Sequence, residues 1–180
     1  MFVIGIAGGS CSGKTTLAHR LSEMFESKKV TVINMDRFYK NPTPDTVAPI
    51  TRIVYPEHNH PDAMKVDEMV AAFNDAINGD SDIVIIEGLF ALYIDAIREK
   101  LDVKIFADLK SDERIVRRIR KFMNPNQTFD QVVARYLDTV RYRHDELIEP
   151  TRWHADMVVN GTLDANKGAA IIKAYIDANV

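Results

Sequence analysis

The stretch Gly8-Gly9-Ser10-Cys11-Ser12-Gly13-Lys14-Thr15 contains two glycines separated by four residues and followed by a lysine and a hydroxyl residue. An apolar run from Phe2 to Ala7 precedes this stretch, and an amphipathic segment from Thr16 to Phe25 follows it. A strand, a glycine-rich turn and a helix start in this order are typical of a loop that binds the phosphates of a nucleoside triphosphate. The alternative is a glycine turn with an exposed lysine, which the flanking strand and helix disfavour.

The residue types of this loop fit phosphate binding. Gly8 and Gly13 can adopt positive φ, which lets successive backbone N–H groups point at phosphate oxygens. Lys14 provides a mobile cation for the β- and γ-phosphates, and the hydroxyl of Thr15 is placed to bind Mg²⁺. We therefore expect ATP and Mg²⁺ as cofactors. The expected ATP contacts are Gly8, Gly9, Ser10, Cys11, Ser12, Gly13, Lys14, Thr15 and Thr16.

Length and composition predict a single globular domain over residues 1–180. A net charge of -3 and a pI near 5.9 argue against a general nucleic-acid binder, because phosphate contacts usually make such a domain basic. Cys11 is the only cysteine, which excludes an internal disulfide and fits a reducing compartment. Neither a basic leader nor a run of about 18 apolar residues is present. We therefore expect a cytoplasmic protein without a membrane partner; the sequence does not indicate an oligomeric state.

Apolar, β-branched runs alternate with amphipathic segments along the chain. Strands are predicted at 2–7, 30–34, 83–86, 103–107 and 155–159, and helices at 16–25, 62–78, 92–99, 111–123, 128–150 and 163–178. This alternation predicts an α/β three-layer fold of the phosphate-loop (P-loop) NTPase type, with a five-stranded parallel sheet. A helical lid is expected at about 111–128, and an acceptor loop at about 36–62.

The predicted strand at 30–34 stops just before Asp36. Ligands of open parallel sheets bind beyond the carboxyl ends of strands, so we expect Asp36 beside the phosphate loop, at the end of the neighbouring strand. This is where a catalytic base is needed. The segment from Lys40 to Pro61 has no periodicity and holds five of the seven prolines. We interpret it as a loop on the acceptor side; a passive surface loop is the alternative.

His58 and His60 lie at the end of this loop, just before a helix start at Pro61-Asp62. Two histidines suggest a metal site, but no cysteine is nearby. Helix capping or contact with the substrate is therefore favoured.

The buried strand at 83–86 ends at Glu87-Gly88. An acidic residue in this position resembles the second acidic element of phosphate-loop enzymes, which holds Mg²⁺ directly or through water. The alternative is a carboxylate that caps the next segment. Thr15 and Glu87 are the candidate metal ligands.

The segment Ser111-Asp112-Glu113 is expected to cap a strongly basic helix. Four cations recur on one face of this helix: Arg114, Arg117, Arg118 and Lys121. A face of a single sign in an acidic protein favours a lid that faces phosphates over a merely solvated surface.

Thr128 and Gln131 have the spacing of a capping box and open a long amphipathic helix. Its apolar stripe is Phe129, Val132, Val133, Tyr136, Leu137, Val140, His144, Leu147 and Ile148. Because His144 lies on this stripe, we expect it to pack in the core or at an interface rather than to act in catalysis.

Several stretches together resemble the uridine kinase and phosphoribulokinase family of phosphate-loop kinases, and the uridine–cytidine kinases most of all. The resemblance covers nearly the whole chain. Four stretches carry it: GIAGGSCSGKTT at 5–16, MDRFYK at 35–40, HPDA at 60–63 and VIIEGLFALY at 84–93. DLKSDERIVRRIR at 108–120 and RHDELIEPTRWHADMVVNG at 143–161 agree more loosely.

The resemblance implies an ATP-dependent kinase that transfers the γ-phosphoryl group to a hydroxyl of a small molecule, most simply a nucleoside or riboside. It implies that Asp36 accepts the hydroxyl proton, with Arg118 and Lys121 in the lid and the segment 155–161 near the adenine. Tyr39 and His60 lie in matching stretches and are candidate substrate contacts, together with Asn59, which directly precedes HPDA. A hydroxyl acceptor benefits from a base whereas a phosphate acceptor needs none, which disfavours a nucleoside monophosphate kinase.

The chain also departs from the family pattern. Asn59 stands where uridine kinases have an acidic residue for the ribose hydroxyls, and Gly79-Asp80-Ser81 replaces a base-binding hairpin. Residues 124–128 replace an Arg-Gly-Arg turn after the lid helix. The identity of the acceptor therefore stays open, and a kinase for a non-nucleoside hydroxyl metabolite is one alternative.

A different alternative is a nucleotide-dependent binding module or switch with slow ATPase activity. The departures above support it, whereas the lack of an Asn-Lys-x-Asp guanine motif gives a GTPase-type switch little support. The sequence does not decide between ATP and GTP as donor, nor whether the lid residues act on the donor or on the acceptor.

Overall fold

A computed structural model describes residues 1–161 and 164–179. Its centre is a sheet of five parallel strands in the order β2-β5-β1-β6-β7. These strands are β1 (Phe2–Gly8), β2 (Val30–Asn34), β5 (Ile83–Glu87), β6 (Val103–Asp108) and β7 (Met157–Asn160). The predicted five-stranded parallel sheet is therefore confirmed, with strand bounds that differ by at most two residues from those expected.

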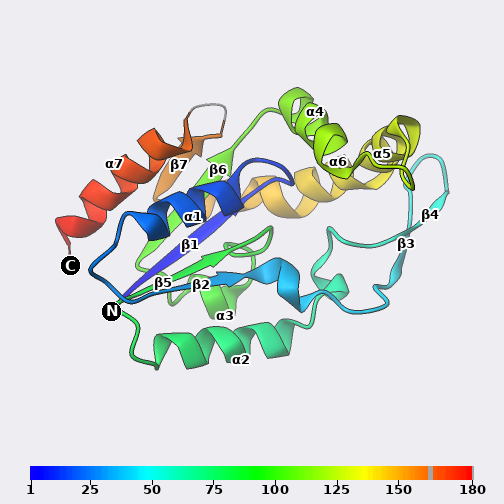
Figure 1. Cartoon of the computed structure of the whole chain (residues 1–180). Coiled ribbons are helices and arrows are strands. Elements are labelled where there is room, and N and C mark those ends of the chain that lie inside the picture. The colour runs from blue at the N-terminus through cyan, green and yellow to red at the C-terminus, as the bar shows by residue number, and fades with distance from the viewer. Residues whose placement is uncertain (162–163, 180) are drawn as a thin grey trace.

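Helices cover both faces of the sheet, which confirms the three-layer architecture (Figure 1). Helices α1 (Lys14–Glu23) and α7 (Ala165–Asp177) pack on one face, and α2 (Val66–Ile77) and α3 (Asp95–Arg98) lie on the other. Every residue of β5 is buried, as expected of a central parallel strand covered on both sides. The predicted start of the last helix, Leu163, lies outside the described residues.

Two apolar clusters hold these layers together. One joins the sheet to α1 and α7, with fully buried Leu21 and Ile172 among its members. The other joins the sheet to α2 and contains Phe73, Phe90 and Phe106. Burying one such side chain contributes about 1.5–3 kcal/mol, so these clusters position the carboxyl ends of the strands on which the site is built.

The segment predicted as a lid, 111–128, contains α4 (Ser111–Phe122), and α5 (Phe129–Arg135) follows it. The expected cap at Ser111 is wrong, because the residue before the helix is Lys110 and no side chain accepts a hydrogen bond there. The capping box of Thr128 and Gln131 is confirmed.

After α5 the chain stays helical, but not uniformly α-helical. It passes through a π-helical turn at Tyr136–Val140, α6 (Arg141–Arg143), a second π-helical turn at His144–Ile148 and a 3₁₀ helix at Glu149–His154. Two residues of the predicted apolar stripe, Phe129 and Leu137, are exposed. Phe129 is the first residue of α5, and Leu137 lies in the first π-helical turn, where the wider geometry shifts the helical register. His144 is buried, as expected.

The acceptor loop is more ordered than predicted. It contains a hairpin of two antiparallel strands, β3 (Asp45–Val47) and β4 (Val54–Pro56), which lies beside α5 in Figure 1. Strands of three residues are too short to show an alternating pattern, so periodicity could not reveal them. Short 3₁₀ helices at Met35–Phe38 and Pro61–Ala63 flank the loop, and α2 begins at Val66 rather than at Asp62.

Candidate active site

The loop between β1 and α1 has the backbone of a phosphate cradle. Gly8 has φ 144° and Gly13 has φ 98°, which L side chains rarely adopt. A Cβ at Gly8 would lie 2.3 Å from the carbonyl oxygen of Ala107, so the loop also approaches β6 too closely for a larger residue. Cys11 adopts φ 65° within the same loop. The chain therefore turns sharply just before the N-terminus of α1.

Lys14 is buried at the start of α1, and its Nζ donates to the carbonyl oxygen of Gly9 at 3.0 Å. Burial lowers the pKa of this ammonium group, and the nearby carboxylates of Glu87 and Asp36 oppose that effect. A buried cation beside the backbone N–H groups at a helix N-terminus is a favourable arrangement for binding a phosphate.

Thr15 and Glu87 form a direct contact between α1 and β5. The hydroxyl of Thr15 donates to Oε1 of Glu87 at 3.0 Å. Burial raises the pKa of the Glu87 carboxyl group, and Lys14 together with the Thr15 hydrogen bond opposes this. Two oxygen groups side by side match the ligands preferred by a hard divalent cation.

Asp36 lies in the 3₁₀ helix after β2, where its backbone N–H donates to Oδ1 of Asn34 at 2.7 Å. The expectation that its strand neighbours β1 is wrong, because β5 lies between them. Asp36 nevertheless lines the same cavity as Lys14 and Thr15, with a volume of about 550 Å³. Residues that follow β2 and end β5 therefore line one cavity with the phosphate loop, although β2 is not paired with β1.

The basic face of α4 turns inward. Arg114 and Arg118 are buried, whereas Val116 is 47% exposed. Nη1 of Arg118 donates to Oγ of Ser10 at 3.0 Å, and its guanidinium lies 4.7 Å from the ring centre of Phe122. Arg118 of this face therefore contacts the phosphate loop, whereas the role of the face as a lid over phosphates stays a prediction.

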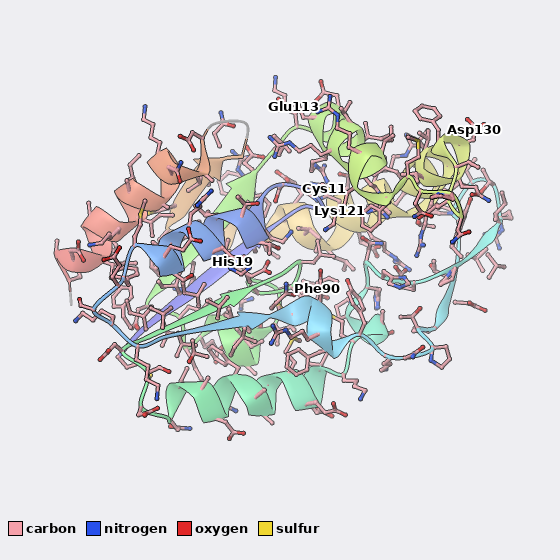
Figure 2. The ribbon with its side chains drawn as sticks, viewed as in Figure 1. Cys11, His19, Phe90, Glu113, Lys121 and Asp130 are labelled. Atoms are coloured by element: carbon pink, nitrogen blue, oxygen red, sulfur yellow. The ribbon has the colours of Figure 1, made fainter. Side chains whose placement is uncertain are left out.

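The four cations of this face have different surroundings. Arg117 and Lys121 also line the cavity, and Nη2 of Arg117 donates to the carbonyl oxygen of Gly161 at 2.8 Å. Arg114 does not line it, because its Nε donates to the carbonyl oxygen of Leu109 at 3.0 Å behind the loop. Figure 2 labels Cys11 in the loop and Lys121 on the lid, which face the same space.

A second cavity of about 300 Å³ adjoins the loop on its other side. Ser12, Gly13 and Thr16 line it together with Asn160 and Gly161, which follow the last strand. A Cβ at Gly161 would lie 2.3 Å from the carbonyl oxygen of Ser12, so the two segments are in close contact. This is the segment near which the resemblance places the adenine.

One wall of the main cavity is built from Tyr39, which precedes the hairpin, and from the segment that follows it. The hydroxyl of Tyr39 donates to the carbonyl oxygen of His58 at 2.6 Å. Tyr39, His58 and Asn59 line the cavity. His60 does not, and its Nδ1 accepts from the backbone N–H of Asp62 at 3.1 Å. That contact matches the capping alternative, and a role of His60 in substrate binding stays a prediction.

Several lining residues were not predicted from the sequence: Leu89, Phe122, Gln127 and Arg135. Arg135 ends α5 and approaches the cavity from the helix that follows the lid. In the sequence it occupies an ordinary polar position of an amphipathic helix, so no local signal distinguishes it.

Within residues 1–161 and 164–179, no group of three or more His, Cys, Asp or Glu side chains is arranged to hold a metal ion. The pair His58 and His60 is therefore not part of such a cluster in the described part of the chain. No helix in that part is long and apolar enough to cross a membrane.

Comparison with known proteins gives concordant matches. A model described as "Phosphoribulokinase / Uridine kinase family" matches residues 3–81 and 50–166. The uridine kinase of Lactococcus lactis subsp. lactis (strain IL1403) is 30% identical over 198 residues, which covers 97% of this chain and 95% of that protein. A uridine kinase of Staphylococcus epidermidis is 33% identical over 181 residues, covering 87% of this chain and 86% of its own length.

Among solved structures, the shikimate kinase from Acinetobacter baumannii in complex with shikimate superposes with a TM-score of 0.61. It is 16% identical in sequence, and the alignment covers 99% of this chain and 94% of that one. At this identity the match bears on the fold alone.

Proposed function

The chain belongs to the phosphoribulokinase/uridine kinase family and is a phosphate-loop small-molecule kinase with ATP as donor, and we propose that its acceptor is a hydroxyl of a nucleoside or another riboside. One observation carries the proposal. The carboxylate of Asp36 lines the same cavity as Lys14 and the Thr15–Glu87 pair. The proposed base and the residues that would bind the phosphates thus line the same cavity.

The loop and the lid would hold the triphosphate. Two buried polar atoms support this role, because Oγ of Ser12 and Nε of Arg118 have no hydrogen-bond partner among the described residues. Buried polar groups are nearly always satisfied, and phosphate oxygens would satisfy these. Lys14, Arg118 and Lys121 would then stabilise the charge that develops on the transferring group. Ser12, Gly13 and Thr16 reach toward the second cavity, which suits the nucleoside part of ATP.

Thr15 and Glu87 would hold Mg²⁺, because their adjacent hydroxyl and carboxylate oxygens fit the ligand preference of this ion. The ion would neutralise negative charge on the β- and γ-phosphates. Phosphate oxygens and water would complete the coordination.

Asp36 would orient the acceptor hydroxyl and remove its proton as the oxygen attacks the γ-phosphorus. Such a base contributes about 10²- to 10⁴-fold to the rate. Tyr39 and Asn59 line the wall next to it and would contact the acceptor; His60 stays a candidate through its place in the HPDA stretch. We also propose a cytoplasmic location, where reducing conditions keep the free thiol of Cys11 intact.

The proposal is tested by measuring ADP release from ATP with a panel of hydroxyl compounds against a water-only background. Uridine, cytidine, adenosine and ribose form the nucleoside and riboside arm, and glycerol and inositol form the non-nucleoside arm. We expect a nucleoside or riboside to raise ADP release at least about tenfold above background. Stimulation by the non-nucleoside arm alone would move the acceptor to another class, and a uniform slow background would support the nucleotide-dependent switch.

A further inference from the structure

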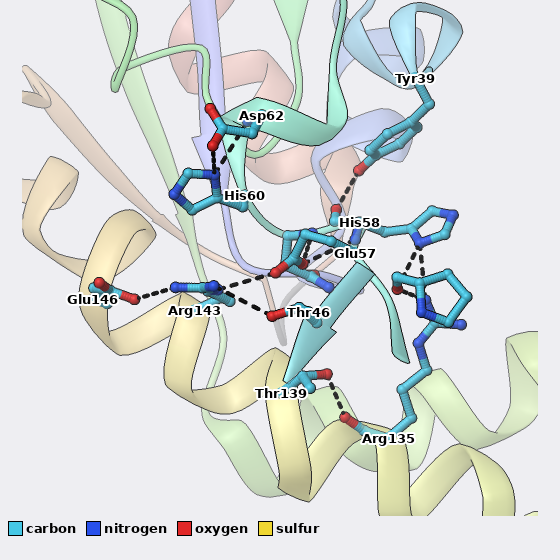
Figure 3. A network of polar contacts seen from close by, with 12 residues as sticks. Tyr39, Thr46, Glu57, His58, His60, Asp62, Arg135, Thr139, Arg143 and Glu146 are labelled. Atoms are coloured by element: carbon cyan, nitrogen blue, oxygen red, sulfur yellow. Dashed lines mark hydrogen bonds and ion pairs between the residues drawn. The ribbon is translucent and has the colours of Figure 1, made fainter. Parts of the chain in front are cut away.

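Arg135 lines the same cavity as Arg118 of α4, and its positive charge lowers the pKa of that guanidinium, but it comes from α5 and is held by a different segment. Its Nη2 donates to the carbonyl oxygen of Pro56 at 2.7 Å and to Nδ1 of His58 at 2.8 Å (Figure 3). It lines the cavity together with His58, Asn59 and Gln127. The hairpin end therefore aims this guanidinium at the space in which the acceptor would bind.

The known partners of Arg135 are electrically neutral. No carboxylate oxygen among the described residues lies within 4.0 Å of its nitrogens, and its buried Nε has no hydrogen-bond partner there. Glu57, which precedes His58, acts on Arg135 through its charge but forms no ion pair with it, because its two carboxylate oxygens are engaged elsewhere. Its Oε2 lies 3.0 Å from Nε of Arg143, while its Oε1 accepts from the backbone N–H groups of His58 and Asn59. Arg135 is thus a half-buried cation that has no ion-pair partner among the described residues.

A half-buried cation without a counter-ion is costly unless a ligand supplies the opposite charge. The cations near the phosphate loop have separate roles: Lys14 is held at Gly9, Arg118 at Ser10 and Arg117 at Gly161. Arg135 is instead held by Pro56 and His58 at the end of the hairpin, and not by the segments that would bind ATP.

The residue after His58 also bears on the charge of this part of the cavity. Where the family resemblance leads one to expect a carboxylate for ribose hydroxyls, this chain has the uncharged Asn59. A carboxylate in that position would repel an anionic acceptor, whereas an amide does not. This part of the cavity thus lacks the carboxylate that the resemblance leads one to expect, and it carries the positive charge of Arg135.

We propose that the acceptor carries an anionic group, a phosphate or a carboxylate, besides the hydroxyl that is phosphorylated, and that Arg135 binds this group. The inference rests on the proposed kinase function. In the reaction the acceptor oxygen forms a bond to the γ-phosphorus, the bond from that phosphorus to the bridging oxygen of ADP breaks, and the hydroxyl proton passes to Asp36. The anionic group stays intact and serves only for recognition.

The test compares matched neutral and anionic hydroxyl compounds by calorimetric titration. The protein is first saturated with a non-hydrolysable ATP analogue, so that anions do not occupy the phosphate loop. Ribose with ribose 5-phosphate and uridine with uridine 3′-monophosphate form the phosphate arm, and glycerol with glycerate and ribose with ribonate form the carboxylate arm. We expect at least one anionic member to bind at least about tenfold more tightly than its neutral counterpart.

The variant Arg135→Gln should weaken binding of that anionic compound about 10- to 100-fold and change binding of its neutral counterpart less than about twofold. Arg135→Lys should retain part of the preference, because it keeps the charge without the planar fork. Arg141→Gln is the control: it removes the same charge from an exposed position on α6. Thermal melting of each variant establishes that it is folded.

The inference is overturned if every neutral compound binds as tightly as its anionic partner, or if Arg135→Gln weakens both members of a pair equally. The second result would assign Arg135 to holding the hairpin through Pro56 and His58. Phosphorylation of uridine with no preference for any anionic compound would overturn the inference and leave the kinase proposal intact. ADP release at the water background for all compounds would count against the kinase proposal, while the titration still decides what Arg135 binds.

Discussion

Thr15 donates a hydrogen bond to Glu87 across 3.0 Å, joining the first turn of α1 to the last residue of β5. Glu87 is opposite Ile6 in the pairing of β5 with β1, the strand that leads into the phosphate loop. The sheet register therefore determines the distance between the two candidate ligands of Mg²⁺. Burial raises the pKa of Glu87, and a bound cation would oppose that effect.

Replacing Glu87 with Gln should raise the Mg²⁺ concentration needed for half-maximal activity at least about tenfold, because a neutral amide is a weaker ligand than a carboxylate. The measurement is a Mg²⁺ titration of ADP formation at saturating ATP. Glu99→Gln, at the exposed end of α3, is the matched control and should leave the titration unchanged. An unaltered Mg²⁺ requirement in Glu87→Gln would show that Glu87 is not a ligand.

Asp36→Asn should lower kcat about 10²- to 10⁴-fold and leave the KM for ATP within about threefold, since the carboxylate acts on the acceptor hydroxyl and not on the donor. Steady-state kinetics with both substrates varied provides the check. Asp75→Asn, on the exposed face of α2, removes the same charge far from the cavity lining and should behave like the wild type. Retention of activity in Asp36→Asn would exclude this residue as the base.

Gly161→Ala should weaken ATP binding about tenfold and destabilise the fold by about 1–3 kcal/mol, because overpacking against backbone atoms has costs of this size. The added Cβ would lie 2.3 Å from the carbonyl oxygen of Ser12 and 3.0 Å from that of Asp108. Equilibrium binding of an ATP analogue and urea unfolding give the two quantities. At Gly79 the nearest atom would lie 3.3 Å away, so Gly79→Ala should have the smaller effect on both, and equal effects would contradict the expectation.

His144 should make the protein less stable as the pH falls. Burial, together with the positive charges of Arg114 and Lys14, lowers the pKa of His144 to about 3 from 6.5, although its Nε2 lies 3.2 Å from the Glu149 carboxylate. At a pH between about 3 and 6.5, His144 is therefore protonated in the unfolded chain and neutral in the folded chain. The stabilising contribution is therefore complete above pH 6.5 and is lost as the pH falls toward 3.

For this residue alone, the free energy of unfolding should fall by about 1.4 kcal/mol between about pH 7.5 and 5.5. Urea unfolding at these two pH values measures the change. His144→Gln should show a loss smaller by that amount, whereas His154→Gln, at an exposed position, should keep the wild-type dependence. The same pH dependence in wild type and His144→Gln would mean that His144 titrates normally in the folded protein.

Much of the architecture follows from local patterns. The alternation of β-branched runs with amphipathic segments identified the five parallel strands and the helices that cover them, because each pattern reflects which side of an element is buried. The capping box at Thr128 and the buried position of His144 were predicted for the same reason. The cap expected at Ser111 was wrong, since a suitable residue type does not ensure that its side chain bonds to the helix end.

By itself, the sequence determined the phosphate loop, the chain order of the elements and the candidates Asp36 and Glu87, because these depend on neighbouring residues and short-range periodicity. Only the tertiary structure decided that β5 separates β2 from β1, that Arg118 bonds to Ser10 of the phosphate loop and that a hairpin end positions Arg135 beside the main cavity. These features arise from contacts between segments far apart in the chain. The free energies of burial and hydrogen bonding that select them exist only once the layers have packed together.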